Sequence, residues 1–322
     1  IDCGATCSAN FNSGISVALA AVPFSGSYLK RWSGACTGTG ACNVTMDAAK
    51  SANAEFKLKT TIPRLANIST RMQVLTGNDV MIGGFIIGGA VPKTVVVRAR
   101  GPSLIPFGIP NALVNPRMDL FSGQDIIATN DNWQTQTIPA DVAAIQASGF
   151  APTNDLESAI RTTLAPGAYT AVVTGVGNGS GVGIVEVFEV DLPEIPLINI
   201  STRGQVLTAN DVMIGGFIIQ GDAPQTVIIR ARGPSLVPFG IPNALLDPVL
   251  QLFDGPTPIA TNDDWQLQAT PADLARIQGS GFAPSDTREA VISITLPPGA
   301  YTAIVTGKNS TTGVGIVEVF AQ

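Results

Sequence analysis

Two acidic turns carry the residues best suited to binding a ligand. They read Thr129-Asn130-Asp131-Asn132-Trp133 and, 132 positions later, Thr261-Asn262-Asp263-Asp264-Trp265. Calcium takes several oxygen ligands, and clustered Asp and Asn side chains in a loop supply them. The candidate calcium ligands are Asn130, Asp131 and Asn132 in the first turn and Asn262, Asp263 and Asp264 in the second. The alternative, which we favour, is structural: the Asn and Asp side chains close a tight turn, and the Trp packs on the edge of a sandwich.

A pair of arginines is the second candidate site. Arg98 and Arg100 are two positions apart, as are Arg230 and Arg232, and alternation along a strand places both on one face. Two neighbouring guanidinium groups can hold a carboxylate or a sugar acid, or they can pair with carboxylates of their own copy. We favour the internal ion pair. Its candidate partners are Glu157 or Glu186 in the first copy and Glu289 or Glu318 in the second.

Residue types suited to catalysis are scarce. The chain has no histidine, which removes the commonest general base and excludes a serine triad. A carboxylate pair is the remaining possibility, but the acids are sparse and lie mostly in turns. Gly83-Gly84 and Gly88-Gly89 are not followed by the Lys-Ser/Thr of a phosphate loop, and glycines inside a strand mark a bulge or close packing. We therefore predict that the chain is not an enzyme.

The elements that must position these residues occur twice. Residues 65–190 and 197–322 repeat each other without a gap, from LANISTR and LINISTR onward. A duplicated unit is typical of a building block. Together with the Pro-containing connectors, which stiffen a chain, the repeat predicts three domains, with bounds 1–60, 61–191 and 192–322.

Apolar runs predict a sandwich of strands in each copy. Thr270 followed by Pro271 and, two positions on, Asp273 predicts the start of a short helix at 271–278. The first 60 residues read as a small β domain, so the fold class is all-β. The strands expected in the first copy are 73–76, 80–87, 93–99, 117–121, 125–128, 168–174 and 182–188, with counterparts in the second.

All four cysteines, Cys3, Cys7, Cys36 and Cys42, lie in the first 42 residues. An even number in one small domain favours disulfides, and an oxidising location outside the cytoplasm, over a zinc site. We favour Cys36–Cys42, because the intervening TGTGA is typical of a hairpin loop that joins its flanking strands. Cys3–Cys7 then follows by elimination.

Composition narrows the partners. A net charge of −6 and a pI near 4.7 argue against binding nucleic acid, and the absence of an 18-residue apolar run argues against a membrane span. The first residues lack a signal-peptide pattern, so we expect a mature secreted chain. Charged residues are only 13% of the chain, which leaves exposed strands poorly protected against self-association.

Residues 3–56 resemble the divergent internalin-type B-repeat domain of bacterial surface and secreted proteins, in particular through RWSGACTGTGACNVTM. Members of that family usually carry another strand before the IDCGATC segment, which implies processing or a strand supplied by a neighbouring molecule. The later half of each copy, with its ND turn and its PGxYT strand, is similar to the pre-peptidase C-terminal domain. The whole copy resembles an uncharacterised repeat of secreted bacterial proteins. These resemblances imply two tandem jelly-roll-like β-sandwiches after a small disulfide-bonded β domain, and calcium at the ND turn.

The functional prediction is a non-enzymatic extracellular protein of a surface or matrix that associates with itself. A head-to-tail contact that does not close generates a filament, and strand addition can supply that contact. The alternative is an adhesin or carbohydrate-binding module that binds a glycan. Sugar binding needs exposed aromatic rings, and the candidates are Trp32, Trp133 and Trp265.

Overall fold

The computed structural model describes residues 8–23, 27–38, 41–58, 63–191, 195–221 and 223–322. It divides the chain into two units, Ile1–Thr60 and Thr61–Gln322. Strands dominate both units, which confirms the all-β class. The sequence predicts boundaries after residues 60 and 191. Both copies of the repeat lie in the second unit and share one core.

The first unit consists of two two-stranded antiparallel sheets in its described part. Strands β1 (Ser16–Leu19) and β3 (Cys42–Thr45) form one sheet, and β2 (Ser27–Gly34) and β4 (Ala52–Leu58) form the other. The predicted Cys36–Cys42 disulfide is present. The sequence predicts that the strands flanking this disulfide pair as a hairpin, and this prediction is wrong. Strand β2 pairs with β4, and β3 pairs with β1. The disulfide therefore connects the two sheets. Cys3 and Cys7 lie outside the described residues.

Each copy in the second unit has eight strands, one α-helix and two short 3-10 helices (η) in the same order. The first copy comprises β5 (Arg64–Val74), β6 (Met81–Ile87), β7 (Lys93–Arg100), η1 (Pro102–Phe107), β8 (Pro116–Ser122), β9 (Asp125–Asn130), α1 (Ala140–Ala147), β10 (Ser158–Leu164), β11 (Gly167–Gly175), η2 (Val176–Asn178) and β12 (Gly181–Glu189). The second comprises β13 (Leu197–Val206), β14 (Met213–Gln220), β15 (Gln225–Arg232), η3 (Pro234–Phe239), β16 (Pro248–Asp254), β17 (Thr257–Asn262), α2 (Pro271–Gly279), β18 (Ala290–Leu296), β19 (Gly299–Gly307), η4 (Lys308–Ser310) and β20 (Gly313–Ala321).

Each copy is a jelly roll. In the first copy the strands pair in the order β10-β7-β12-β5 in one layer and β9-β8-β11-β6 in the other. The second copy follows the same pattern, with β18-β15-β20-β13 facing β17-β16-β19-β14. The chain thus crosses between two four-stranded layers after most of its strands. This is the jelly-roll arrangement of eight strands.

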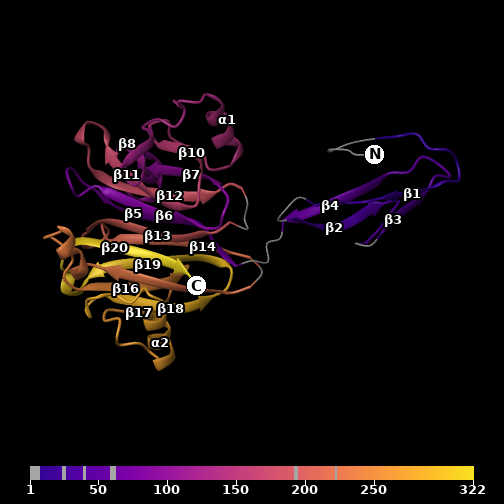
Figure 1. Ribbon diagram of the computed structural model, residues 1–322. Helices are drawn as coiled ribbons and strands as arrows, with labels where there is room; N and C mark the ends of the chain where they lie inside the picture. The colour runs from indigo at the N-terminus through magenta and orange to yellow at the C-terminus, as the bar shows by residue number, and fades with distance from the viewer. Residues whose placement is uncertain (1–7, 24–26, 39–40, 59–62, 192–194, 222) are drawn as a thin grey trace. The chain divides into compact units, whose positions relative to one another are not determined.

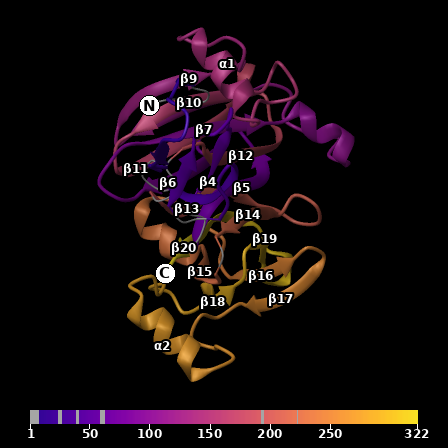
Figure 2. The ribbon, with the colours of Figure 1, turned by 90° about the vertical axis from the view of Figure 1, so that its right-hand side faces the viewer.

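The two jelly rolls join edge to edge. Strand β5 pairs antiparallel with β14, and β13 lies against β6 in the second layer. Each layer thus continues from one copy into the other and contains eight strands. Helices α1 and α2 lie at opposite ends of the resulting sandwich (Figures 1 and 2). We call the junction of the copies, formed by β5, β6, β13 and β14, the seam.

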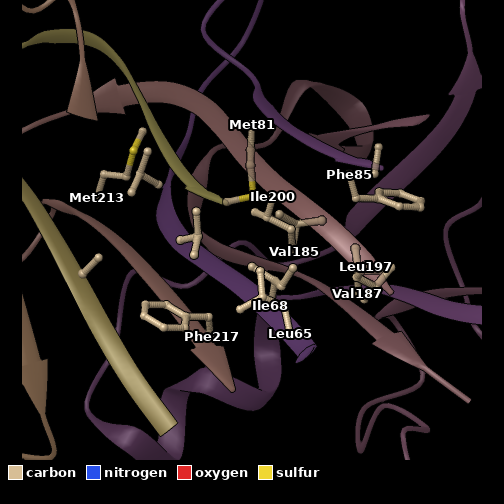
Figure 3. Packing of buried hydrophobic residues seen from close by; sticks show 14 of the residues in the cluster. Leu65, Ile68, Met81, Phe85, Val185, Val187, Leu197, Ile200, Met213 and Phe217 are labelled. Atoms are coloured by element: carbon tan, nitrogen blue, oxygen red, sulfur yellow. The ribbon is translucent and has the colours of Figure 1, made fainter. Parts of the chain in front are cut away.

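Both copies contribute equivalent side chains to a single hydrophobic core. Leu65 and Leu197, Met81 and Met213, and Phe85 and Phe217 are all buried in it, together with Ile68 and Ile200. Figure 3 shows these residues gathered between the strands of the seam. Burial of apolar surface is the main stabilising contribution to folding, so this shared cluster binds the copies into one unit.

Most of the predicted strands are present, but two were misjudged. Strand β5 begins at Arg64, whereas the prediction began at residue 73, and β10 was not predicted at all. Helix α2 begins where expected, and the Thr270 side chain accepts a hydrogen bond from the Asp273 N–H. Strand β5 is polar in sequence, yet it is almost entirely buried, because it lies inside the seam. Polar side chains at such a position need hydrogen-bond partners that only the folded seam supplies.

Removing the Cys36–Cys42 disulfide should destabilise the first unit alone. Because the bond closes a loop with five intervening residues, chain entropy predicts a loss of about 2 kcal/mol in the Cys36→Ser/Cys42→Ser variant. Differential scanning calorimetry should show a lower transition for residues 1–60 and an unchanged transition for residues 61–322. A shift of both transitions would contradict the division into two units.

Candidate functional site

The Asn of each acidic turn completes the edge of a sheet. The Asn130 Nδ2 group donates to the carbonyls of Asn132 at 3.1 Å and Thr135 at 3.0 Å. Its Oδ1 atom accepts a hydrogen bond from the backbone N–H of Ala159 at 3.0 Å. Ala159 lies in β10, the outermost strand of its layer, so the Asn130 side chain takes the place of a neighbouring strand. Edge strands commonly need such protection against pairing with another chain.

A glutamine completes this protection of the β10 edge, and we call Asn130 and Gln136 together the edge cap. The Gln136 Nε2 group donates to the carbonyl of Ala159 at 3.0 Å, so one loop satisfies both backbone groups of that residue. In the second copy Asn262 accepts from the N–H of Val291 at 2.9 Å, and Gln268 donates to its carbonyl at 3.1 Å. The cap is therefore the same in both copies.

The tryptophans of the two turns are buried. Trp133 is 4% exposed and Trp265 is 7% exposed. Trp133 packs with Ile145 of α1 and Ala159 of β10, and Trp265 occupies the equivalent position beside Ile277. Packing on the edge of the sandwich thus accounts for both tryptophans. Neither ring is available for a sugar to stack on.

A lysine already supplies the positive charge at the second turn. The Lys308 Nζ atom lies 2.9 Å from Asp263 and 3.7 Å from Asp247. The hydrogen bond to Asp263 raises the pKa of Lys308 above its ordinary value. Burial raises the pKa of the Asp247 carboxyl, with further contributions from Asp264 and Asp263, while Lys308 opposes the shift. These carboxylates surround an ammonium group, so the residues present do not fit a calcium ion.

The first turn differs from the second and is also a poor fit for calcium. Val176 and Asn115 stand where the second copy has Lys308 and Asp247. A polar hollow of about 130 Å³ is lined by Arg117, Thr129, Asn130, Asp131 and Thr135. It offers one carboxylate and one guanidinium group, whereas calcium needs several anionic or carbonyl oxygens. Within the described ranges, no cluster of three or more His, Cys, Asp and Glu side chains is placed to hold a metal ion.

The arginine pairs form internal ion pairs. Arg98 and Arg100 lie on one face of β7 and are partly exposed, whereas Ala99 between them is fully buried. The Arg98 guanidinium pairs with Glu186, donates to the carbonyl of Phe150 at 2.7 Å and lies 4.7 Å from the Phe188 ring centre. Arg230 makes the same contacts in the second copy, with Glu318, Phe282 and Phe320.

Glu157, the other carboxylate proposed to pair with the arginines, has a different role. This side chain is fully buried. Its Oε1 atom accepts hydrogen bonds from the backbone N–H groups of Gly101 at 2.8 Å and Ser103 at 2.9 Å. Glu289 does the same for the second copy, and its Oε2 atom also pairs with the Arg232 guanidinium at 3.9 Å, as one of the candidate pairings predicted. The carboxylates thus hold the turn that follows the arginine strand.

Sequence reasoning missed the glutamines of the edge cap. Gln136 and Gln268 follow the capping Asn by six positions in both copies, while the residues just before each Gln, Thr135 and Leu267, differ between the copies. The Asn-x5-Gln spacing retained in both copies was the available signal. It was not readable as a cap, because β10 itself had not been predicted.

Similarity to known proteins bears mainly on the first unit. Residues 3–60 match the family model described as the divergent InlB B-repeat domain. Comparison with curated proteins finds no match. Among solved structures, the chain has a weak similarity to the major capsid protein P2 from bacteriophage PM2, with a TM-score of 0.21 and 9% identity over 81% of this chain and 98% of that chain. The expected likeness of each copy to pre-peptidase C-terminal domains finds no support among these matches.

Loss of the edge cap should destabilise the second unit. In Asn130→Ala the buried N–H of Ala159 loses its acceptor, so we expect the free energy of unfolding to fall by about 1–3 kcal/mol, measured by urea titration. Asn262→Ala should behave alike. Asn132→Ala is the matched control, because Asn132 contributes only its backbone carbonyl to the cap. Equal losses for Asn130→Ala and Asn132→Ala would contradict the capping role.

Calcium should not stabilise the protein. Because Lys308 and Arg117 already supply positive charge at the two turns, we expect the melting temperature to be the same in calcium and in EDTA. Lys308→Met tests the second turn further, since it removes the competing ammonium group. A melting temperature that rises with calcium in the unaltered protein, and no longer rises in Asp131→Ala or Asp263→Ala, would restore the calcium prediction.

Proposed function

We propose that this chain is a non-enzymatic structural component of a bacterial surface or extracellular matrix, and that copies associate through strand addition at the first unit. The observation that carries the proposal is a contrast between the strand edges of the two units. The large sandwich has protected edges, whereas most strand edges in the described part of the small unit have no partner strand.

The outer edges of the large sandwich resist the addition of another strand. Strands β10 and β18 are capped by the Asn and Gln side chains described above. In β17, Pro258 lacks an N–H to donate. The pairing of β9 and of β17 with their neighbours is also interrupted by a register shift. Short, bulged or proline-containing edges are the usual means by which proteins prevent sheets from joining.

The first unit has much less protection. Each of its described sheets has only two strands, so β1, β3 and β4 each have one edge that forms no ladder with another described strand. The outer edge of β2 makes one contact, in which the Trp32 N–H donates to the carbonyl of Gly38 at 2.6 Å. Two-stranded sheets are marginally stable on their own. A strand from a second copy would extend such a sheet with main-chain hydrogen bonds. If the donor and acceptor edges differ, the contact repeats without closing and generates a fibre.

Two observations support the proposed location. Residues 3–60 match the InlB B-repeat family, the same unit contains a disulfide, and disulfides persist in oxidising compartments outside the cytoplasm. No helix in the described part of the chain is long and apolar enough to cross a membrane. A surface or matrix protein combines these features.

Exposed apolar loops are a further feature that suits an adhesive protein. Phe107 is 78% exposed at the end of η1, and its counterpart Phe239 is 77% exposed. Ile105 and Val237 are exposed beside them. Exposed apolar groups of this kind often mark contact surfaces. The glycan-binding alternative has no comparable support, because Trp32, Trp133 and Trp265 are all buried.

Lysines on the β1 edge should prevent assembly without unfolding the first unit. Ser16 and Ala18 are exposed, so Ser16→Lys/Ala18→Lys adds charge where a second strand would pair. Negative-stain electron microscopy should show filaments of the unaltered protein and dispersed particles of this variant. Thr257→Lys on β17 is the matched control, and it should still assemble, because that edge is already interrupted by Pro258.

Two outcomes would count against the proposal. Unaltered protein that remains monomeric at high concentration, measured by light scattering, would exclude self-association. Filaments of Ser16→Lys/Ala18→Lys that match those of the unaltered protein would exclude the β1 edge as the joint.

A further inference from the structure

The seam is organised around an approximate two-fold axis. Equivalent residues of the two copies face each other in parallel register, at Leu65 with Leu197 and at Gln73 with Gln205. The hydroxyl of Thr70 hydrogen-bonds that of Thr202 at 2.8 Å. In a two-fold contact each position meets its own counterpart. The same strands would therefore allow a first copy to pair with another first copy, unless their side chains prevent it.

One such pair of counterparts breaks the symmetry. Met72 is 1% exposed in the shared core, and Gly204 stands at the equivalent position of the second copy. A Cβ atom on Gly204 would lie only 1.7 Å from the Met72 Cε atom. The glycine thus provides the space that the methionine fills. Two methionines would compete for this volume, and two glycines would leave a cavity.

A second pair breaks the symmetry in the opposite sense. A Cβ atom on Gly88 would lie 2.7 Å from the Ile198 Cδ1 atom and 3.1 Å from Pro196. The counterpart of Gly88 is Gln220, which accepts a hydrogen bond from Arg64 at 2.8 Å. Two second copies would bring Gln220 against Ile198. Two first copies would place the buried Arg64 beside Gly88, without that hydrogen bond.

We propose that the seam is a heterotypic interface, in which a first copy recognises a second copy and rejects another first copy. The determinants are the size match of Met72 with Gly204 and of Ile198 with Gly88. Each match opposes one of the two wrong pairings, which is how interfaces obtain specificity from clashes as well as contacts. The partner of this surface is the second copy of the repeat in the same chain.

Recognition of this kind matters for a protein that assembles at high local concentration. First copies of adjacent chains are kept from pairing across their β5 and β6 edges, so each chain completes its own sandwich. Assembly is then left to other surfaces. The inference does not depend on self-association, because the size matches act within a single chain.

Exchanging the two residues tests the proposal. Gly204→Met should lower the melting temperature of the second unit by several degrees through overpacking, and Met72→Gly should lower it through a cavity. In Met72→Gly/Gly204→Met the methionine crosses the axis into the space left by the other, so most of the loss should be recovered. Calorimetry of the full chain measures all four proteins. A double variant that melts as low as the two separate losses combined would overturn the proposal.

Disulfide trapping provides a measurement that does not require a destabilised variant. Thr70→Cys/Thr202→Cys should form a bond within one chain, visible as a monomer of altered mobility on a non-reducing gel. Thr70→Cys alone should give no linked dimer, because a cysteine at this position would meet its counterpart only if two first copies paired. A linked dimer of Thr70→Cys alone would overturn the proposal.

Discussion

The need to satisfy the backbone at strand edges governs the arrangement of this protein. A single jelly roll of this sequence would leave β5 and β6 unpaired along one side, with their polar groups and the apolar residues between them exposed. The second copy supplies β14 and β13 to these same edges. At the outer edges, side chains of the acidic turn take the place of a neighbouring strand at β10 and β18. Pairing at the centre and capping at the ends are two solutions to one problem.

Duplication therefore has a different meaning from the one suggested by the sequence. The copies are not two independent domains, since their layers are continuous and they share one core. They have also diverged where they meet, at Met72 and Gly204, and at the acidic turns, where Lys308 stands in place of Val176. A ligand site that occurs twice was the natural expectation from the repeat. The residues that differ show that equivalent turns have acquired different electrostatic surroundings.

The two units differ in how well their strand edges are protected, which suits them to different roles. The large unit buries its inner strand edges and protects its outer ones, which suits a stable spacer. In its described part, the small unit depends on two short sheets connected by the Cys36–Cys42 disulfide, with a small core around Trp32, Cys42 and Val44. Limited burial gives a small domain little stability of its own, so a partner strand would stabilise this unit more than the large one. This difference is the physical basis for our proposal that copies of the protein associate through the small unit.

The sequence by itself determined the elements whose residues are apolar and periodic, such as β6, β7, β11 and β12, as well as the Thr270 cap of α2 and the Cys36–Cys42 bond. It also indicated that the arginines pair internally, although their partners Glu186 and Glu318 lie 88 positions away along the chain. The tertiary structure alone decided the extent of β5, the presence of β10 and the role of Asn130 as the cap of that strand. Their polar residues become part of a buried sheet only when partners 29 to 132 positions away supply hydrogen bonds. Periodicity reports which residues avoid water, but it does not report where a buried polar group finds its partner.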